Sequence, residues 1–259
     1  MATYVMSDIH GCIDEVKEML EKINFTDKDR LIFAGDYVDR GPKNYETLEW
    51  IKNAPKNITF LMGNHDVDFI KYIDILSRVS KDNISKSDVF FAAHMENYWF
   101  DHYGTLRELY LKNNVSLERL IEYKNIFKTF KYFKKLQINN KKFIIVHAGY
   151  IEEKDFIPDN YHYYTIEDYY VWARDEAYTN TSGIKDTTII AGHTPTVIKR
   201  EFCYTEGKVY KQYNKSNNCT LYDIDCGCTY AYGGYKESFM CKLACIRLED
   251  EQVFYVQKK

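Results

Sequence analysis

Short apolar segments recur along the chain, and each of them ends at a group of polar residues. Each segment has four or five residues and does not alternate, which is typical of a strand that is buried on both faces. We therefore predict central strands at 3–6, 31–34, 58–62, 143–146 and 188–191.

Helical spacing appears between these segments. Apolar residues within 14–23 lie three and four positions apart, which predicts an amphipathic helix between the first two strands. A second helix is expected over 45–53, between the second strand and the third. The span 69–140 shows mostly helical periodicity, and we expect it to form an inserted helical cap.

The C-terminal part of the chain is rich in predicted strands. Alternating segments at 220–224, 239–248 and 253–257 predict antiparallel strands that complete a second sheet. Strands alternating with helices indicate the α/β class. No internal repeat or flexible linker divides the 259 residues, so we expect a single domain over 1–259 with the mainly helical insertion at about 69–140.

Composition excludes several classes of partner. The 35 basic and 38 acidic residues give a net charge of −3, which predicts neither nucleic acid nor an anionic membrane as a partner. No apolar stretch approaches the roughly 20 residues that span a bilayer, and the first residues do not resemble a secretory signal. Seven cysteines, an odd number, favour a reducing compartment, so a cytoplasmic protein is expected. The sequence does not predict the oligomeric state.

The candidate chemistry follows the five predicted strands. Four of the seven histidines lie there beside glycine, whereas His94, His102 and His162 have no such context and are expected to be structural. Because open α/β sheets bind ligands beyond the carboxyl ends of their strands, we expect these five endings to converge on one point. The endings are Ser7-Asp8-Ile9-His10-Gly11, Gly35-Asp36-Tyr37-Val38-Asp39-Arg40-Gly41, Gly63-Asn64-His65-Asp66, His147-Ala148-Gly149 and Gly192-His193-Thr194-Pro195.

These residue types are suited to binding metal ions. Asp8 and His10 are two positions apart, so an extended chain would direct both side chains to one face, where they can share a cation. Asp36 has two carboxylate oxygens and could bridge two ions about 3.5 to 4 Å apart. The shell of the second ion could be completed by Asn64, His147 and His193.

Taken together, these motifs resemble the calcineurin-like metallophosphoesterases, and within them the phosphoprotein phosphatase family. The compact length and the Trp172-Ala173-Arg174 element are similar to the lambda-type bacterial and phage serine/threonine phosphatases, and also to the symmetrical diadenosine tetraphosphatases. The resemblance implies a four-layer α/β/β/α sandwich of two mixed β-sheets flanked by helices.

The resemblance also implies a pair of divalent ions. One would be held by Asp8, His10 and Asp36, and the other by Asp36, Asn64, His147 and His193. Manganese is expected first, with iron or zinc as alternatives, because imidazole is a poor ligand for calcium. Two such ions acidify a water that they share, which supplies a hydroxide nucleophile at neutral pH.

Four further residues receive roles from the same resemblance. His65 would donate a proton to the leaving group as general acid, and Asp39 would orient its imidazole. Arg40 and Arg174 would bind the phosphoryl oxygens, since a guanidinium matches them bidentately. Asp66 departs from the family pattern, which usually has glutamate there, so the packing of this loop is in question.

The sequence leaves the substrate open. We rank a phosphorylated protein or peptide first, cleaved by a serine/threonine or dual-specificity phosphatase, and a dinucleotide polyphosphate second. A catalytically silent binding module is a third hypothesis, disfavoured because all ligand candidates, His65 and Asp39 are present.

Cysteine chemistry is also disfavoured. Cys241 and Arg247 match the Cys-x5-Arg spacing of cysteine phosphatases, but their segment alternates like a strand. A structural zinc ion among the C-terminal cysteines has unusual ligand spacing and is not expected.

Overall fold

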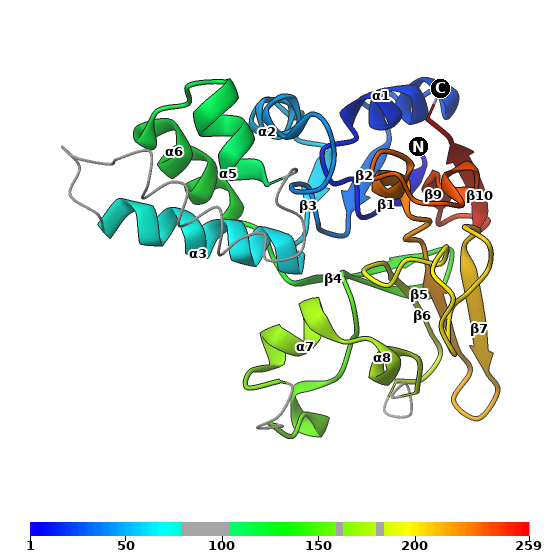
Figure 1. Cartoon of the computed structure of the whole chain (residues 1–259). Helices are drawn as coiled ribbons and strands as arrows, with labels where there is room; N and C mark the ends of the chain where they lie inside the picture. Colours follow the sequence, from blue (N-terminus) through cyan, green and yellow to red (C-terminus); the bar gives the residue numbers. More distant parts are fainter. Residues whose placement is uncertain (79–103, 159–162, 180–183, 259) are drawn as a thin grey trace.

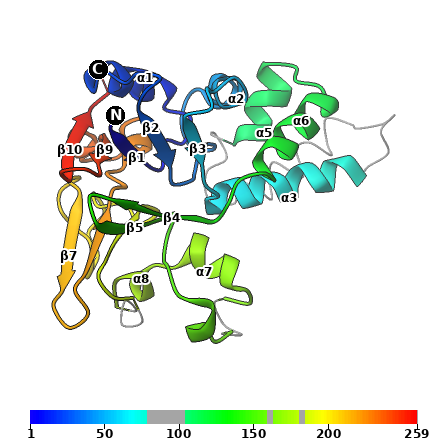
Figure 2. The same cartoon turned by 180° about the vertical axis from the view of Figure 1, so that it is seen from behind.

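The structure, a computed structural model, describes residues 1–78, 104–158, 163–179 and 184–258. Within these residues two five-stranded mixed sheets lie between helices (Figures 1 and 2). His94, His102 and His162 lie outside the described residues.

The first sheet has the order β10-β9-β1-β2-β3. Its strands β1, β2 and β3 are parallel, while β9 runs antiparallel to β1 and pairs with β10 at the edge. The strands are β1 (Thr3–Met6), β2 (Arg30–Phe33), β3 (Ile58–Phe60), β9 (Leu243–Arg247) and β10 (Gln252–Val256).

The second sheet has the order β4-β5-β6-β8-β7. Its central strands β5, β6 and β8 are parallel, with an antiparallel strand at each edge. The strands are β4 (Phe133–Ile138), β5 (Lys141–Val146), β6 (Thr187–Ala191), β7 (Tyr210–Asn214) and β8 (Cys219–Asp223).

The helices cover the outer faces of the two sheets, with α1 and α2 over the first sheet and α7 and α8 over the second (Figure 1). The α-helices are α1 (Ile13–Lys22), α2 (Asn44–Lys52), α3 (Asn64–Arg78), α5 (Thr105–Arg107), α6 (Leu117–Phe127), α7 (Ile166–Trp172) and α8 (Asp175–Thr179). A π-helical turn, η1, spans Glu108–Lys112, and 3₁₀ turns η2, η3 and η4 span Glu153–Asp155, Cys228–Ala231 and Ser238–Met240.

Three apolar clusters explain the layers. Successive strand residues point to opposite faces, so Tyr4 and Met6 of β1 pack with the helices while Val5 joins a cluster between the sheets. That middle cluster also takes Ile145 from β5 and Ile190 from β6. The third cluster joins the second sheet to α7 and α8. The predicted α/β/β/α sandwich is therefore confirmed.

Two details of the predicted elements are wrong. The strands β9 and β10 complete the first sheet beside β1, not the second, because alternation predicts a strand without naming its partner. The helical span expected over 69–140 is also too long, since the described helices end at Phe127 and Phe133–Ile138 forms β4. Residues 79–103 of that span lie outside the described residues.

Candidate metal centre

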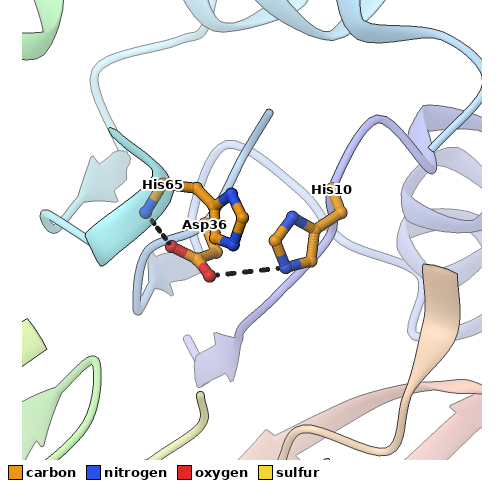
Figure 3. Close-up of side chains that lie close together, drawn as sticks. All are labelled: His10, Asp36 and His65. Carbon is orange, nitrogen blue, oxygen red and sulfur yellow. Dashed lines mark hydrogen bonds and ion pairs between the residues drawn. The ribbon is translucent and has the colours of Figure 1, made fainter. Parts of the chain in front are cut away.

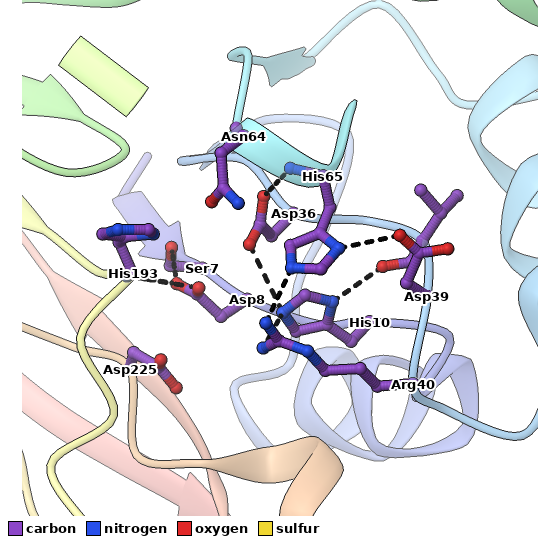
Figure 4. A network of polar contacts seen from close by, with 12 residues as sticks. Ser7, Asp8, His10, Asp36, Asp39, Arg40, Asn64, His65, His193 and Asp225 are labelled. Carbon is purple, nitrogen blue, oxygen red and sulfur yellow. Dashed lines mark hydrogen bonds and ion pairs between the residues drawn. The ribbon is translucent and has the colours of Figure 1, made fainter. Parts of the chain in front are cut away.

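The residues predicted to converge are brought together at the carboxyl ends of the parallel strands. Figure 4 shows side chains from the segments that follow β1, β2, β3 and β6 directed towards one another. Sharp backbone turns at these strand ends make this possible, since non-glycine residues there adopt the left-handed conformation that the surrounding structure must stabilise. Positive φ angles occur at Asp8, His10, Asp36, Asp39, Arg40 and His193.

Two glycines allow the carboxylates to approach the neighbouring backbone. A Cβ atom at Gly63 would lie 2.3 Å from Asp36 Oδ1, and one at Gly192 would lie 2.1 Å from Asp8 Oδ2. Side chains cannot occupy such positions, so both glycines are required where they stand.

One group of possible ligand atoms is formed by Asp36, His147 and His193, which are all buried and offer atoms within 4.8 Å of one another. His147 Nε2 lies 3.4 Å from Asp36 Oδ1, 3.2 Å from His193 Nδ1 and 3.0 Å from Asn64 Oδ1. His147 Nδ1 donates to the carbonyl of Ala34 at 2.8 Å, which leaves the Nε2 lone pair directed into the group.

A second group contains His10, Asp36 and His65, again with ligand atoms within 4.8 Å of one another (Figure 3). His10 Nδ1 donates to the carbonyl of Val38 at 2.7 Å, so its Nε2 lone pair faces Asp36 Oδ2 at 3.3 Å. Asp36 thus directs one oxygen to each group, as expected of a bridging ligand.

The electrostatics of both groups favour a cation. Burial, with the charges of His147 and Arg174, holds the pKa of His193 well below its usual value, so its ring is neutral. Its buried Nε2 has no hydrogen-bond partner among the described residues. Burial opposes ionisation of Asp36, but the charges of His147 and His65 outweigh it and hold the pKa of Asp36 well below its usual range. A buried ionised carboxylate beside a neutral imidazole supplies ligand atoms that suit a divalent cation.

Arg40, predicted to bind phosphate, contacts two imidazoles of the site. Its Nη1 lies 3.1 Å from His10 Nε2, and its Nη2 lies 2.7 Å from His65 Nε2 (Figure 4). A guanidinium can only donate, so it places positive charge against the imidazole lone pairs of His10 and His65 in the second group. Arg40 therefore contacts the predicted ligand His10 and the predicted general acid His65.

Asp8 lies at the edge of both groups. Its carboxylate oxygens accept the backbone N–H of His193 at 3.1 and 3.0 Å, and Oδ2 also accepts the hydroxyl of Ser7. The ligand groups found within the described residues do not include it. Asp8 follows β1 and His193 follows β6, so these hydrogen bonds join the two sheets at the site.

His65, Asp39 and Thr105 form a chain of hydrogen bonds, of which the sequence analysis predicted only the pair His65 and Asp39. His65 Nδ1 donates to Asp39 Oδ2 at 2.7 Å, as predicted. On its other oxygen Asp39 accepts the hydroxyl and the backbone N–H of Thr105, the latter at 3.2 Å. Burial opposes ionisation of Asp39, but the hydrogen bonds from His65 and Thr105 outweigh it and lower its pKa. Thr105 lies within the span 69–140, for which the sequence predicted helical periodicity but no site residue.

We predict that Thr105→Val lowers kcat for an aryl phosphate about tenfold, because a hydrogen bond to a charged group contributes roughly 1.5 to 3 kcal/mol. The manganese content should stay unchanged, since Thr105 contacts Asp39 rather than a predicted ligand. Thr105→Ser keeps the hydroxyl and should restore most of the rate in a steady-state assay. A normal rate for Thr105→Val would show that Asp39 needs no support from this residue.

Asp66, which stands where the family usually has glutamate, is fully hydrogen-bonded to the neighbouring loops. Its carboxylate accepts the backbone N–H groups of Asp36, Tyr37 and Gly63 at 2.9, 3.0 and 2.8 Å. The shorter acid thus joins the loops after β2 and β3 and fills the space between them.

Asp225 is a site residue that the sequence analysis missed. It is buried beside Asp8 (Figure 4), and burial together with that carboxylate raises its pKa to about 8. It follows β8, which is parallel to β6, so the same rule of polar residues after a strand would have found it.

Arg174 lies at the mouth of the centre, directly after α7. Its Nη1 donates to the carbonyl of His193 at 3.2 Å and to the hydroxyl of Thr194 at 3.4 Å. Beside it is an open cleft of about 500 Å³. The cleft is lined by Tyr163, Tyr164, Asp168, Trp172, Arg174, Asp175, Glu176 and Arg200.

Comparison with known proteins agrees with this geometry. The sequence profile of the calcineurin-like phosphoesterases matches residues 1–222. The chain belongs to this family. Calcineurin-like phosphoesterases are metal-dependent hydrolases of phosphoester bonds, and the two groups of carboxylate and imidazole donors fit divalent ions.

Two similar curated proteins carry the same name. The symmetrical bis(5'-nucleosyl)-tetraphosphatase of Vibrio campbellii is 41% identical over 93 residues, which cover 36% of this chain and 34% of that protein. The protein of the same name from Aliivibrio salmonicida is 37% identical over 105 residues, covering 39% and 38% respectively. The matched part spans about a third of the length of these relatives.

Solved structures show the fold. A putative diadenosine tetraphosphatase has a TM-score of 0.56 at 17% identity, covering 98% of this chain and 92% of its own. A serine/threonine phosphatase from Saccharomyces cerevisiae has a TM-score of 0.54 at 14% identity, covering 100% and 80% respectively. Among the described helices of this metallophosphoesterase, none has the length and apolar character needed to cross a bilayer.

The Cys-x5-Arg alternative finds no support. Burial raises the pKa of Cys241 to about 11, which disfavours a reactive thiolate. Arg247 ends β9 and pairs with Asp250 at 2.6 Å. The segment is a strand, as its alternation predicted, and not a phosphate-binding loop.

Proposed function

We propose that this metallophosphoesterase hydrolyses dinucleoside polyphosphates symmetrically, converting diadenosine tetraphosphate into two molecules of ADP. The observation that carries the proposal is a line of arginines that leads from the candidate metal centre into an aromatic cleft. The names of the curated relatives support the same substrate, which the sequence analysis ranked second.

The arginines are arranged for a substrate with several phosphates. Burial lowers the pKa of Arg174, and the positive charges of Arg200 and Arg40 lower it further, so both lie close enough to act on the Arg174 guanidinium. Arg40 lies at the imidazoles and Arg200 lines the cleft, which places Arg174 between them. Arg40 and Arg174 suffice for the attacked phosphate, whereas a tetraphosphate chain can also engage Arg200.

The aromatic residues of the cleft suit a nucleobase. Tyr163, Tyr164 and Trp172 line it, and Tyr164 is 70% exposed, so its ring is free for stacking. Stacking of a base on an aromatic ring contributes about 1 to 3 kcal/mol. An adenine that stacks here would place its phosphates along the arginines.

The reaction follows from the roles proposed for the chain. Divalent ions held by Asp8, His10, Asp36, Asn64, His147 and His193 would lower the pKa of water and so supply the nucleophile. Arg174 would hold the attacked phosphate. Arg40 would join it once His10 binds an ion and His65 carries the proton that it donates, because neither imidazole then accepts from the guanidinium. His65, oriented by Asp39, would give a proton to the departing phosphate oxygen.

The two ADP products account for every atom of the substrate and of one water molecule. The bridging P–O bond between the second and third phosphates breaks, and the departing ADP keeps the bridging oxygen. The other ADP receives its new oxygen from water. No oxidant, reductant or second substrate is consumed.

A phosphoprotein phosphatase is the second candidate. The three carboxylates that line the cleft, Asp168, Asp175 and Glu176, favour it because they would attract a basic phosphopeptide. The same centre could attack a phosphomonoester.

A substrate panel distinguishes the two candidates. With manganese added, we expect the kcat/KM for diadenosine tetraphosphate to exceed that for phosphoserine, phosphothreonine and phosphotyrosine peptides by more than about tenfold. The chromatogram should show ADP alone. A preference for a peptide, or a mixture of ATP and AMP, would contradict the proposed function.

Arg200→Ala should raise the KM for diadenosine tetraphosphate about tenfold, because one charge-assisted contact to the polyphosphate is lost. The kcat/KM for a small aryl phosphate should not change, since that substrate does not extend to the cleft. Lys199→Ala removes an equal charge from the adjacent exposed residue, which does not line the cleft, and serves as the control. Equal losses on both substrates would place Arg200 at the reaction centre instead.

A further inference from the structure

A further cluster of possible metal ligands lies outside the two groups around Asp36. Cys12, Glu15 and Cys228 offer two thiol sulfurs and a carboxylate oxygen within 4.8 Å of one another. All three are buried, with exposures of 1%, 5% and 4%. None belongs to the two groups around Asp36.

Glu15 is the observation that points to a missing ligand. Its Oε1 accepts the hydroxyl of Tyr232 at 2.5 Å, but its Oε2 is buried and has no hydrogen-bond partner among the described residues. A buried carboxylate oxygen without a partner costs free energy. A cation at the two thiols would provide that partner.

Two local features of the fold bring Cys12, Glu15 and Cys228 together. Cys12 is the N-cap residue of α1 and Glu15 lies three positions later, so both face the same side of the first helical turn. Cys228 begins the 3₁₀ turn η3 directly after Gly227, whose φ of 73° only glycine adopts easily. The cluster therefore joins the start of the chain to its C-terminal part.

We propose that Cys12, Glu15 and Cys228 bind a single thiophilic divalent ion, with zinc as the expected metal. Zinc bonds thiolate sulfur at about 2.3 Å and carboxylate oxygen at about 2.0 to 2.2 Å in tetrahedral geometry. Tetrahedral ligands of this kind lie roughly 3.8 Å apart, which the present spacing allows with small side-chain movements. Binding displaces the two thiol protons, and the fourth position remains for water or a further ligand.

The site would fix the loop that carries His10. Cys12 follows that residue by two positions, and its thiol lies 3.7 Å from the carbonyl of His10. A metal bond to Cys12 anchors this turn to η3, so the proposed site is structural and its occupancy can be measured without enzyme activity.

Cobalt spectroscopy tests the proposal on the full chain. Protein fully reduced with a phosphine is titrated with Co²⁺, and thiolate-to-cobalt charge-transfer absorption is recorded. The groups around Asp36 contain no cysteine and are silent in this region. We expect strong absorption in the wild-type protein that added zinc abolishes, because zinc displaces cobalt from thiolates.

Variants locate the absorption. Cys228→Ser should abolish it, and Glu15→Gln, which keeps the side-chain volume, should weaken cobalt binding by at least about tenfold. Cys219→Ser, a buried cysteine of β8 outside the cluster, should leave it unchanged. Absence of the absorption in reduced wild-type protein would overturn the proposal. Its persistence in Cys228→Ser, or a Cys12–Cys228 disulfide that forms in place of metal binding, would do the same.

Discussion

Asp36→Asn is expected to lower kcat/KM for an aryl phosphate by at least about 10³-fold and to reduce the bound manganese from two equivalents to one or none. Asp36 directs one oxygen to the group of His147 and the other to His10. An asparagine replaces one of these oxygens with an amide group that only donates, so it cannot serve both groups. Steady-state kinetics and elemental analysis of the dialysed protein measure the two effects.

Two controls separate this loss from misfolding. Asp250→Asn makes the same chemical change at an exposed pair with Arg247, away from the site, and should keep full activity and both metal equivalents. The circular dichroism of Asp36→Asn should match the wild-type spectrum. Normal turnover by the folded variant would exclude a bridging role for Asp36.

His65→Gln is expected to lower kcat about 10² to 10⁴-fold while the protein keeps its metal ions. A general acid matters most when the leaving group is basic. The loss should therefore be smallest for 4-nitrophenyl phosphate, larger for phenyl phosphate and largest for an alkyl phosphate. The slope of log kcat against the leaving-group pKa measures this dependence.

The three phosphate esters also distinguish two roles for His65, general acid and metal ligand. The second role is possible because His65 forms a group of potential ligands with His10 and Asp36. His147→Gln removes a proposed ligand and should lose metal with a similar loss on all three substrates. Asp39→Asn should follow the pattern of His65→Gln with a smaller effect, since it alters only the orientation of the imidazole. If His65→Gln behaves like His147→Gln, His65 is a ligand and not the acid.

The convergence of the site could be predicted because it depends on a local pattern. A buried strand of a parallel sheet is apolar throughout, so the first polar residue after it marks the edge where its neighbours also end. Asp36 after β2 and His147 after β5 were found in this way although they belong to different sheets. Their separation in sequence did not matter.

The remaining features depend on contacts between distant segments, which local patterns do not carry. Thr105 reaches Asp39 from a span without motifs, and Cys228 meets Cys12 from the other end of the chain. The assignment of β9 to the first sheet has the same origin. The contacts of Arg40 with His10 and His65 could not be predicted, because its motif gives the residue type but not the direction of a long side chain.

The central claim is that these strand ends hold a pair of divalent ions on either side of Asp36. Anomalous diffraction from crystals grown with Mn²⁺ tests it most directly. We expect two manganese peaks about 3.5 to 4 Å apart, one near His10 and one near His147 and His193, with the Asp36 carboxylate between them. Crystals that bind no manganese there, or a single ion that Asp36 does not contact, would contradict the account.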